Sequence, residues 1–430
     1  MGRMKSIKSA YLYVWFIVVV ALLTMCLMWT VYLIPIDKIR ENARPSAEIL
    51  TLTPRFLWYK TKIPSGTIDK ITDARMLNMA SFLGRGDSFR DSLLNPETYY
   101  VWWAPTSLTQ SLAKDILDEG TVFDYPRFWH GYLLLLKPLL VFFDLGEIRI
   151  INLIFQAGLL LAILYLMYKR LGFKHCAAFM TAVSFLNPVT SWMCLEYANV
   201  INVMLLTMLW VLINKNPDDK YIFFVIGVVT ILFDFITFPL VTLGIPLIAY
   251  ILLYKRGFKD DIKCVFRNSL LWLFGYAGTW LMKWGLATML TDQNVIKNGW
   301  DNVIHRMYGF EIGDSVNAND INILKSIQLN LQEFYSIVSL YYFCIFLVII
   351  IGSCLFYRYK IKVTYEVLVL LGIGLMPFVW YSVLVNHSVI HAYLFAHKIL
   401  VVSVYAVLSA IVCCFEAKKR ENRWVTYFTK

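Results

Sequence analysis

The sequence predicts an all-α membrane protein of about ten transmembrane helices with a large first extracytoplasmic loop. Three observations carry this prediction. Apolar residues make up 59% of the 430 residues, charged residues only 16%, and long apolar runs alternate with short basic connections. A soluble domain would carry roughly a quarter charged residues, so we expect membrane lipid to solvate most of the chain. The net charge of +11 sits in the clusters between apolar runs, which is typical of orientation signals and argues against nucleic acid as a partner.

The apolar runs predict a single polytopic membrane domain over residues 1–430. A helix needs about 20 apolar residues to cross the hydrocarbon core. The first run is too long for a signal-peptide core and lacks a small-residue cleavage site, so we expect it to be retained. The expected spans are 11–34, 148–168, 175–195, 197–213, 221–237, 239–254, 269–290, 336–357, 363–384 and 398–415.

The positive charges predict the orientation of these spans. The connections 195–197, 237–239 and 385–397 contain no Lys or Arg. The opposite connections, which are 1–8, 169–174, 215–220, 255–267, 358–362 and 418–430, hold 21 of them. Because basic residues favour the cytoplasmic side, we expect a multi-pass protein of the cytoplasmic (inner) membrane with both termini in the cytoplasm.

Two polar segments are then extracytoplasmic loops. The first, 36–147, is expected to contain juxtamembrane helices, and the second is 291–335. The apolar stretch Gly131–Phe143 is short and contains Lys137 and Pro138, so we expect it to lie against the outer face. None of the eight cysteines falls between residues 36 and 130, which argues against a disulfide-stapled exported domain, and no spacing suggests a metal site.

Two acids in the first loop are candidate catalytic groups. Asp69 and Asp73 precede apolar residues at helical spacing, with Thr72 or Asp73 expected as the N-cap. The structural alternative is an acidic cap on a juxtamembrane helix. The functional interpretation is a carboxylate near the membrane surface that acts as a general base.

The same loop ends in a segment rich in aromatic and ionisable residues, Asp124 to Tyr132. Aromatic residues there are typical of an interfacial belt, which explains Phe128 and Trp129. A guanidinium at Arg127 beside the imidazole of His130 is suited to a phosphate. Asp124 is a further candidate acid.

The remaining candidates lie at later outer turns. Asp234 interrupts an apolar run, and an ionisable group there is a functional hypothesis by default. His387 and His391 share the i, i+4 spacing of zinc helices, but no third ligand is evident, so sugar or phosphate contacts are favoured. Four further residues are candidates only because they are expected on the outer side of the membrane near its surface: Lys283, His305, Arg306 and Asp314. For the second polar segment, a solvated loop without a site is the better explanation.

Four stretches together resemble bacterial GT-C superfamily glycosyltransferases from cell-surface polysaccharide clusters. The resemblance covers most of the chain, and the order and shared sidedness of the stretches make it specific. The chain departs from the family at Lys70–Ile71 and at His397–Lys398, which bears on donor specificity. The stretches are Asp69-xxx-Asp73-Ala74, Tyr125–Tyr132, Asp234–Pro239, and Asn386-His387-Ser388 with His391.

The resemblance implies an inverting hexosyl- or pentosyltransferase without a cofactor. It implies a polyprenyl-phosphate sugar as donor and a cell-surface glycan or lipid-linked acceptor, with the reaction at the extracytoplasmic face. Asp73 matches the family's catalytic acid best, with Asp69 second. The implied donor phosphate or sugar contacts are Arg127, His130, Asp234, Asn386, His387, His391 and Lys398.

Three alternatives stay open. A transporter or flippase for lipid-linked glycans would carry charges along a central path and related halves, and the chain has few mid-span charges and no internal repeat. A polysaccharide polymerase would act on the same substrates but usually has its large outer loop late in the chain. A noncatalytic scaffold is the third alternative.

Overall fold

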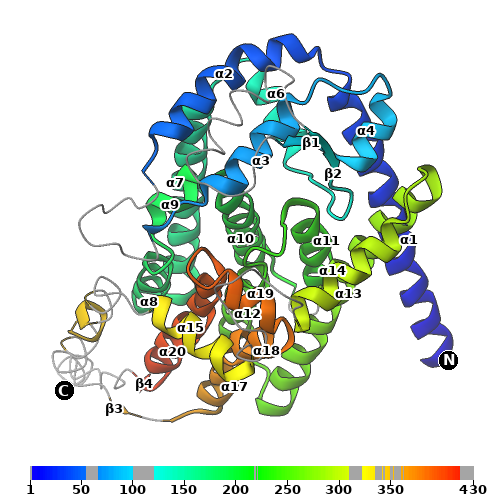
Figure 1. Ribbon diagram of the computed structural model, residues 1–430. Coiled ribbons are helices and arrows are strands. Elements are labelled where there is room, and N and C mark those ends of the chain that lie inside the picture. Colours follow the sequence, from blue (N-terminus) through cyan, green and yellow to red (C-terminus); the bar gives the residue numbers. More distant parts are fainter. Residues whose placement is uncertain are drawn as a thin grey trace, which may run out of the picture.

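The computed structural model describes residues 2–54, 66–99, 121–216, 219, 221–308, 322–334, 341, 344–348, 352, 360–361 and 363–416. Within these residues the protein is all-α apart from two short strand pairs. Long helices form a bundle, and the segments that follow α1 form a layer over one end of it (Figure 1). We call this layer, residues 36–54, 66–99 and 121–144, the upper layer. The start of α1 and the end of α20 lie at the opposite end of the molecule (Figure 1).

Five helical segments of the described chain are long and apolar enough to cross a membrane. They differ in how much protein covers them: only 17% of the α7 window is buried, against 72% for the segment that ends in α20. The α7 helix therefore lies at the periphery, and α20 lies inside the bundle. The segments are the apolar part Tyr11–Tyr32 of α1 (Gly2–Tyr32), α7 (Leu145–Leu171), α10 (Leu195–Ile213), α17 (Tyr365–Gly374) with α18 (Met376–Val383), and η3 (Ala396–Leu400) with α20 (Val401–Cys413).

The sequence predicts ten spans, and the structure defines five by length and composition. Two more apolar helices are shorter, α11 (Ile222–Phe233) and α12 (Leu240–Leu253). At 1.5 Å per residue each extends only about 20 Å. Most of the expected span 336–357 lies outside the described residues.

Proline breaks two of the expected spans. The expected span 175–195 divides into α8 (Phe173–Ser184) and α9 (Pro188–Met193), because Pro188 begins a new helix and disfavours helical backbone before it. A second break, at Leu375 between α17 and α18, has a different cause: Pro377 has no N–H to donate to the carbonyl oxygen of Ile373. Apolar runs measure hydrophobic length, but they do not reveal these interruptions.

The α13 helix (Phe258–Leu290) is longer than predicted. Its 33 residues extend about 50 Å, so it reaches well beyond a membrane core. The segment 255–267 was expected to be a basic connection, but from Phe258 onward it is the first part of this helix. Asp260 and Asp261 in the first turn favour a helix start there.

The upper layer contains short elements around a core of its own. Leu50, Leu77, Leu133 and Leu140 are fully buried in this core. The α6 helix is too short to span, and it packs within the layer, with Lys137 donating to the carbonyl oxygen of Ala80. The sequence analysis did not predict the antiparallel strand pair. The elements are α2 (Ile36–Leu52), α3 (Lys70–Ser81), α4 (Ser88–Leu94), β1 (Pro96–Tyr99), β2 (Thr121–Asp124) and α6 (Leu133–Leu140).

The second polar segment is not a generic loop. It contains α14 (Val295–Tyr308) and α15 (Ile323–Phe334), which pack against α19 (Val385–Ile390). The close approach of α14 to α13 requires Gly299, because a Cβ there would lie 2.4 Å from the Trp284 ring. A second strand pair joins β3 (Lys360–Ile361) to β4 (Phe415–Glu416).

Two glycines allow α11 and α13 to cross with their backbones in contact. A Cβ on Gly227 would lie 2.1 Å from the carbonyl oxygen of Trp272, and one on Gly275 would lie 2.3 Å from that of Phe224. Small residues at such crossings are the usual basis of helix packing in membranes.

We predict that Gly275→Leu destabilises the protein by roughly 1–3 kcal/mol or more, because the added side chain forces the two helices apart. Gly285→Leu on the same helix is the matched control, since nothing lies within 4 Å of a Cβ there. Thermal unfolding in detergent checks this. Equal midpoints for both variants would contradict the crossing.

Candidate functional site

The candidate site lies where the upper layer meets the ends of α10 and α11. Four carboxylates gather there, and we call them the acid cluster: Asp69, Asp73, Glu196 and Asp234. Each exposes 3% of its surface or less. The other three all act electrostatically on Glu196, so they lie within interaction range of it. Three of the four were candidates from the sequence.

Asp69 is the N-cap of α3. Its carboxylate accepts hydrogen bonds from the backbone N–H groups of Ile71 and Thr72, both at 3.1 Å. The expectation that Thr72 or Asp73 forms the cap is therefore wrong by about one turn. With Asp69 committed to capping, Asp73 falls on the buried face of the first helical turn.

Asp73 is fully buried, and one of its oxygens has no partner. The Oδ1 atom accepts from the backbone N–H of Glu196 at 3.2 Å and from the Cys194 thiol at 3.3 Å. The Oδ2 atom is buried without a hydrogen bond. A buried acceptor without a partner is costly in free energy, and a ligand hydroxyl that donated to Oδ2 would remove this cost.

Burial raises the pKa of Asp73 to about 6, against the lowering influence of the Arg149 guanidinium and two backbone N–H groups. Arg149 donates to the carbonyl oxygen of Met193 at 2.7 Å and to the Thr53 hydroxyl at 2.8 Å, and its Nη2 atom is buried without a partner. A carboxyl that titrates near neutral pH is suited to general base catalysis.

The sequence analysis did not select Glu196 or Arg149. Glu196 begins the apolar α10 helix, and its Oε1 accepts from the Thr237 hydroxyl at 3.0 Å while Oε2 is buried without a partner. Arg149 lies in the first turns of α7. An ionisable residue in an apolar helix is itself the signal that would have found both.

Asp234 follows α11, and the protein itself satisfies its oxygens. Oδ2 accepts from the backbone N–H of Ile236 at 2.8 Å and from the Tyr276 hydroxyl at 3.2 Å. Oδ1 accepts from the backbone N–H of Thr237 at 2.9 Å. Asp234 was predicted to contact donor phosphate or sugar. Its bonds hold the turn 234–237 in place.

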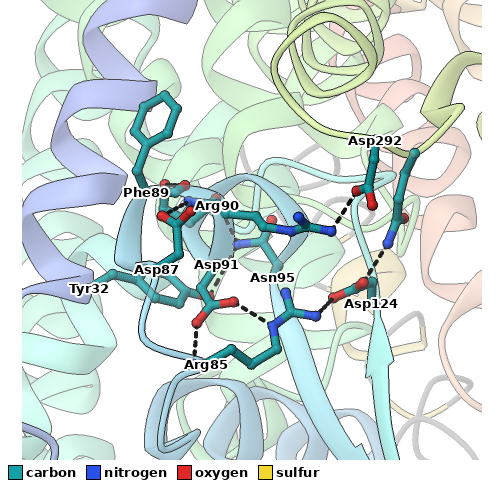
Figure 2. A network of polar contacts seen from close by, with 11 residues as sticks. Tyr32, Arg85, Asp87, Phe89, Arg90, Asp91, Asn95, Asp124 and Asp292 are labelled. Carbon is teal, nitrogen blue, oxygen red and sulfur yellow. Dashed lines mark hydrogen bonds and ion pairs between the residues drawn. The ribbon is translucent and has the colours of Figure 1, made fainter.

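Asp124, the third candidate catalytic acid, belongs to a different network. Its carboxylate pairs with Arg85 at 2.9 Å and accepts from the Gln293 amide at 2.5 Å. Figure 2 shows Arg85 between Asp124 and Asp91, with Arg90 reaching Asp292 nearby. These bonds join the upper layer to the segment after α13, so Asp124 fastens the two together.

The Tyr125–Tyr132 segment docks the upper layer onto the bundle. The guanidinium groups of Arg75 and Arg127 lie 4.6 and 4.7 Å from the centre of the Tyr125 ring. The Arg127 carbonyl oxygen accepts from the indoles of Trp280 and Trp284. Its side chain donates to Asn298 at 3.1 Å, while its Nε is buried without a partner.

His130 lies among aromatic rings and is uncharged. Burial lowers its pKa to about 3. Its Nε2 atom donates to the carbonyl oxygen of Tyr125 at 2.9 Å, which leaves Nδ1 as a buried acceptor without a partner. With Nε2 bonded to the protein, this neutral ring would contact a ligand only by accepting a hydrogen bond at Nδ1.

The residues predicted near the last outer turn divide between two places. Asn386 donates to the carbonyl oxygen of His305 at 2.8 Å, and His387 contacts Arg306 at 2.5 Å. The centre of the His391 ring lies 4.6 Å from that of His387, with the two rings tilted at 56°, and burial lowers the pKa of His391 to about 3.

Lys398 lies elsewhere. Its ammonium group donates to the Leu186 carbonyl oxygen at 3.2 Å and lies 4.9 Å from the centre of the Tyr197 ring. It therefore sits beside the break between α8 and α9, whereas Asn386 and His387 adjoin α14. The two groups therefore have different hydrogen-bond partners.

A deep apolar cavity opens beside the acid cluster. Its volume is about 820 Å³, within the usual size of ligand cavities. Apolar side chains of α12, α13, α17 and α18 line it, among them Leu243, Leu273 and Met376. Arg306, Ile236 and Tyr276 belong to the same lining. The Tyr276 hydroxyl donates to Asp234, and the Asp234 carboxylate acts electrostatically on Arg306, so this end of the cavity adjoins the acid cluster. We call this cavity the apolar groove.

The fold and site together define an all-α membrane protein in which buried carboxylates adjoin an apolar groove. Comparison with protein families, with curated proteins and with solved structures finds no match to the chain. Among the described residues, no three His, Cys, Asp or Glu side chains are arranged to hold a metal ion.

We predict that the Asp73 carboxyl titrates with a midpoint near pH 6, so that its ionised form predominates only above that pH. Infrared titration, with Asp73→Asn subtracted to identify the signal, measures the midpoint. Arg149→Gln should move it upward because a lowering charge is lost. A midpoint near the ordinary value of about 4 in the unchanged protein would mean that Asp73 is open to water.

Proposed function

We propose that this protein is an inverting glycosyltransferase that moves a sugar from a polyprenyl-phosphate donor to a cell-surface glycan or a lipid-linked acceptor. One observation carries the proposal. Asp73, which has a buried carboxylate oxygen without a partner, belongs to the same acid cluster as Asp234, and Asp234 acts electrostatically on Arg306, a cation that lines an apolar groove. A general base and a lipid-phosphate site are the two parts that this reaction requires.

In the proposed reaction, Asp73 Oδ2 takes the proton of an acceptor hydroxyl. The hydroxyl oxygen attacks the anomeric carbon as the bond from that carbon to the phosphate oxygen breaks. Attack from the face opposite the leaving group inverts the configuration, and polyprenyl phosphate departs with the bonding electrons. A fixed cation stabilises the charge that develops on the phosphate, and the reaction requires no cofactor.

The apolar groove supports a lipid-linked donor rather than a nucleotide sugar. Its lining is almost wholly apolar, and Trp272 and Trp380 contribute large ring surfaces. A polyprenyl chain gains free energy when it leaves water, whereas a nucleotide would leave its base and ribose without hydrogen-bond partners in such a groove.

Charge supports the sidedness of the proposal. The basic start of α1 and the first turns of α13, which also carry basic residues, lie at the end of the molecule opposite the upper layer (Figure 1). We therefore assign the upper layer and Asp73 to the extracytoplasmic face of the cytoplasmic membrane, with both termini in the cytoplasm.

A transporter or flippase of lipid-linked glycans is the second candidate, because a groove with a cation at one end also suits the movement of a lipid phosphate. The two functions differ in what they require of Asp73. A flippase needs no base, whereas a transferase loses its chemical step without one.

We predict that Asp73→Asn lowers sugar transfer by at least about 10²-fold, the lower range of what a positioned base contributes. The assay is transfer of labelled sugar from a panel of polyprenyl-phosphate sugars by the purified protein in nanodiscs. Asp37→Asn, which alters an exposed acid of the upper layer, is the control and should be silent. Near-normal transfer by Asp73→Asn, with the protein folded, would move the base to Asp69 or Asp124. Transfer by no form of the protein would favour the flippase.

We predict that cysteines introduced into the upper layer and at the start of α13 lie on opposite sides of the membrane. A membrane-impermeant maleimide added to intact cells should label Leu83→Cys, in the upper layer, above the background of the unchanged chain. It should label Lys259→Cys, at the start of α13, only after permeabilisation. Both positions are exposed, so access reports the side of the membrane. The reverse pattern would overturn the assigned orientation.

A further inference from the structure

We propose that His387 is a positioning residue that holds the Arg306 guanidinium at the apolar groove as a phosphate-binding group. We further propose that the turn at Asp234 fixes His387 in the tautomer this requires. The inference deepens the proposed function and rests on it for the identity of the ligand. It assigns the donor phosphate to Arg306, which sequence reasoning left among residues of a solvated loop.

The contact between Arg306 and His387 determines the protonation of the ring. Arg306 Nη1 lies 2.5 Å from His387 Nδ1, and a guanidinium has no acceptor, so Nδ1 must accept. The ring's other nitrogen, Nε2, lies 2.8 Å from the carbonyl oxygen of Ile236 and must donate to it. His387 is therefore a neutral imidazole in which both nitrogens form hydrogen bonds. Burial, together with the nearby Arg306 and His391, lowers the pKa of His387, which agrees with this neutral form.

The carbonyl that fixes this tautomer belongs to a strained residue. Ile236 has φ of 67°, a left-handed conformation that β-branched residues rarely adopt. Asp234 holds it there through the hydrogen bonds from Ile236 and Thr237 to its two oxygens. Strain of this kind persists only where surrounding structure enforces it, and it concentrates at functional sites.

The other side of the guanidinium is held from its own helix. Arg306 Nε donates to the Asn302 side chain at 2.9 Å, one turn earlier in α14. The α14 helix is fixed in turn by the contact of Gly299 with Trp284 and by the bond from Asn386 to the His305 carbonyl oxygen. Arg306 is thus oriented by two elements, and its remaining N–H donors are available to a ligand.

The described side chains that hydrogen-bond to Arg306 are neutral, and Asp234 acts on its charge only through space. Among the described residues, no carboxylate forms an ion pair with Arg306, although seven such pairs form elsewhere. A desolvated cation outside an ion pair is costly, and an anion that enters the groove and pairs with it would lower that cost. The planar fork of a guanidinium matches two phosphate oxygens.

The groove identifies the chemistry of the anion. Its apolar lining adjoins the guanidinium, so a ligand that fills both parts has a long hydrocarbon chain and a phosphate end. Free phosphate shares the charge but not the chain, and the test separates the two.

The test titrates undecaprenyl phosphate, undecaprenol and inorganic phosphate into the full-length protein in nanodiscs. The fluorescence of tryptophans in the groove lining, Trp272, Trp280 and Trp380, reports binding. We expect His387→Phe and Arg306→Gln each to weaken undecaprenyl phosphate binding by about tenfold or more, the effect of a lost charge-assisted hydrogen bond. Undecaprenol binding should not change.

Three comparisons distinguish positioning from a general packing role. His387→Gln keeps an acceptor for Arg306 and a donor for Ile236, so it should restore binding to within about threefold. The double variant Arg306→Gln/His387→Phe should bind no more weakly than Arg306→Gln alone, because His387 acts through Arg306. Lys297→Gln, which removes an exposed cation from the same helix, should have no effect.

Other outcomes overturn the inference. Full binding by His387→Phe, equal loss of undecaprenol, or additive losses in the double variant would each show that His387 does not act through Arg306. Inorganic phosphate binding with equal affinity would identify a free anion rather than a lipid phosphate. If the unchanged protein binds undecaprenyl phosphate but Asp73→Asn transfers sugar normally, the catalytic proposal fails while the assignment of His387 stands. No binding by the unchanged protein would remove both.

Discussion

Keeping ionisable groups away from water is the physical constraint on which the rest of this structure depends. Asp73 Oδ2, Glu196 Oε2 and Arg149 Nη2 are all buried without hydrogen bonds, close to the point where the upper layer meets the bundle. A low-dielectric interior makes each such atom costly, and equally makes each interaction with an arriving ligand stronger than it would be in water. The rigid frame around them, with its glycine crossing and its core of leucines, supplies the stability that offsets this cost. Preorganised charged groups of this kind are what the proposed transfer reaction would require.

The turn after α11 couples the two halves of the site. Through Thr237 it binds Glu196 in the acid cluster, and through Ile236 it binds His387 beside the groove. Phe235, between them, packs 5.2 Å from the His130 ring and so reaches the segment that docks the upper layer. One short turn therefore sets the relative positions of Glu196, His387 and the aromatic ring of Phe235 beside His130. This explains why a carboxylate, Asp234, is buried there although the protein satisfies both of its oxygens.

The sequence predicted the class of fold and part of the site, and physical reasons explain the limits. Apolar runs revealed a helical membrane protein, but they could not reveal that Pro188 and Pro377 divide two of those runs. Two acids four residues apart, Asp69 and Asp73, can each cap a helix, so periodicity alone could not decide that Asp69 caps and Asp73 is buried. Lys398 and His387 are close in sequence, yet the fold sends them to different neighbours. The sequence alone placed Arg306 in a solvated loop, because its partner His387 in α19 lies 81 residues later in the chain.

A cryo-electron microscopy structure of the protein in nanodiscs with undecaprenyl phosphate would test most directly whether the apolar groove and Arg306 bind a lipid phosphate. The account predicts hydrocarbon density along the apolar groove, phosphate density within hydrogen-bond distance of Arg306, and an open approach from that phosphate to Asp73 Oδ2. Phosphate density at Lys398 or Arg127, or a lipid that leaves Arg306 and Asp73 on separate surfaces, would contradict it.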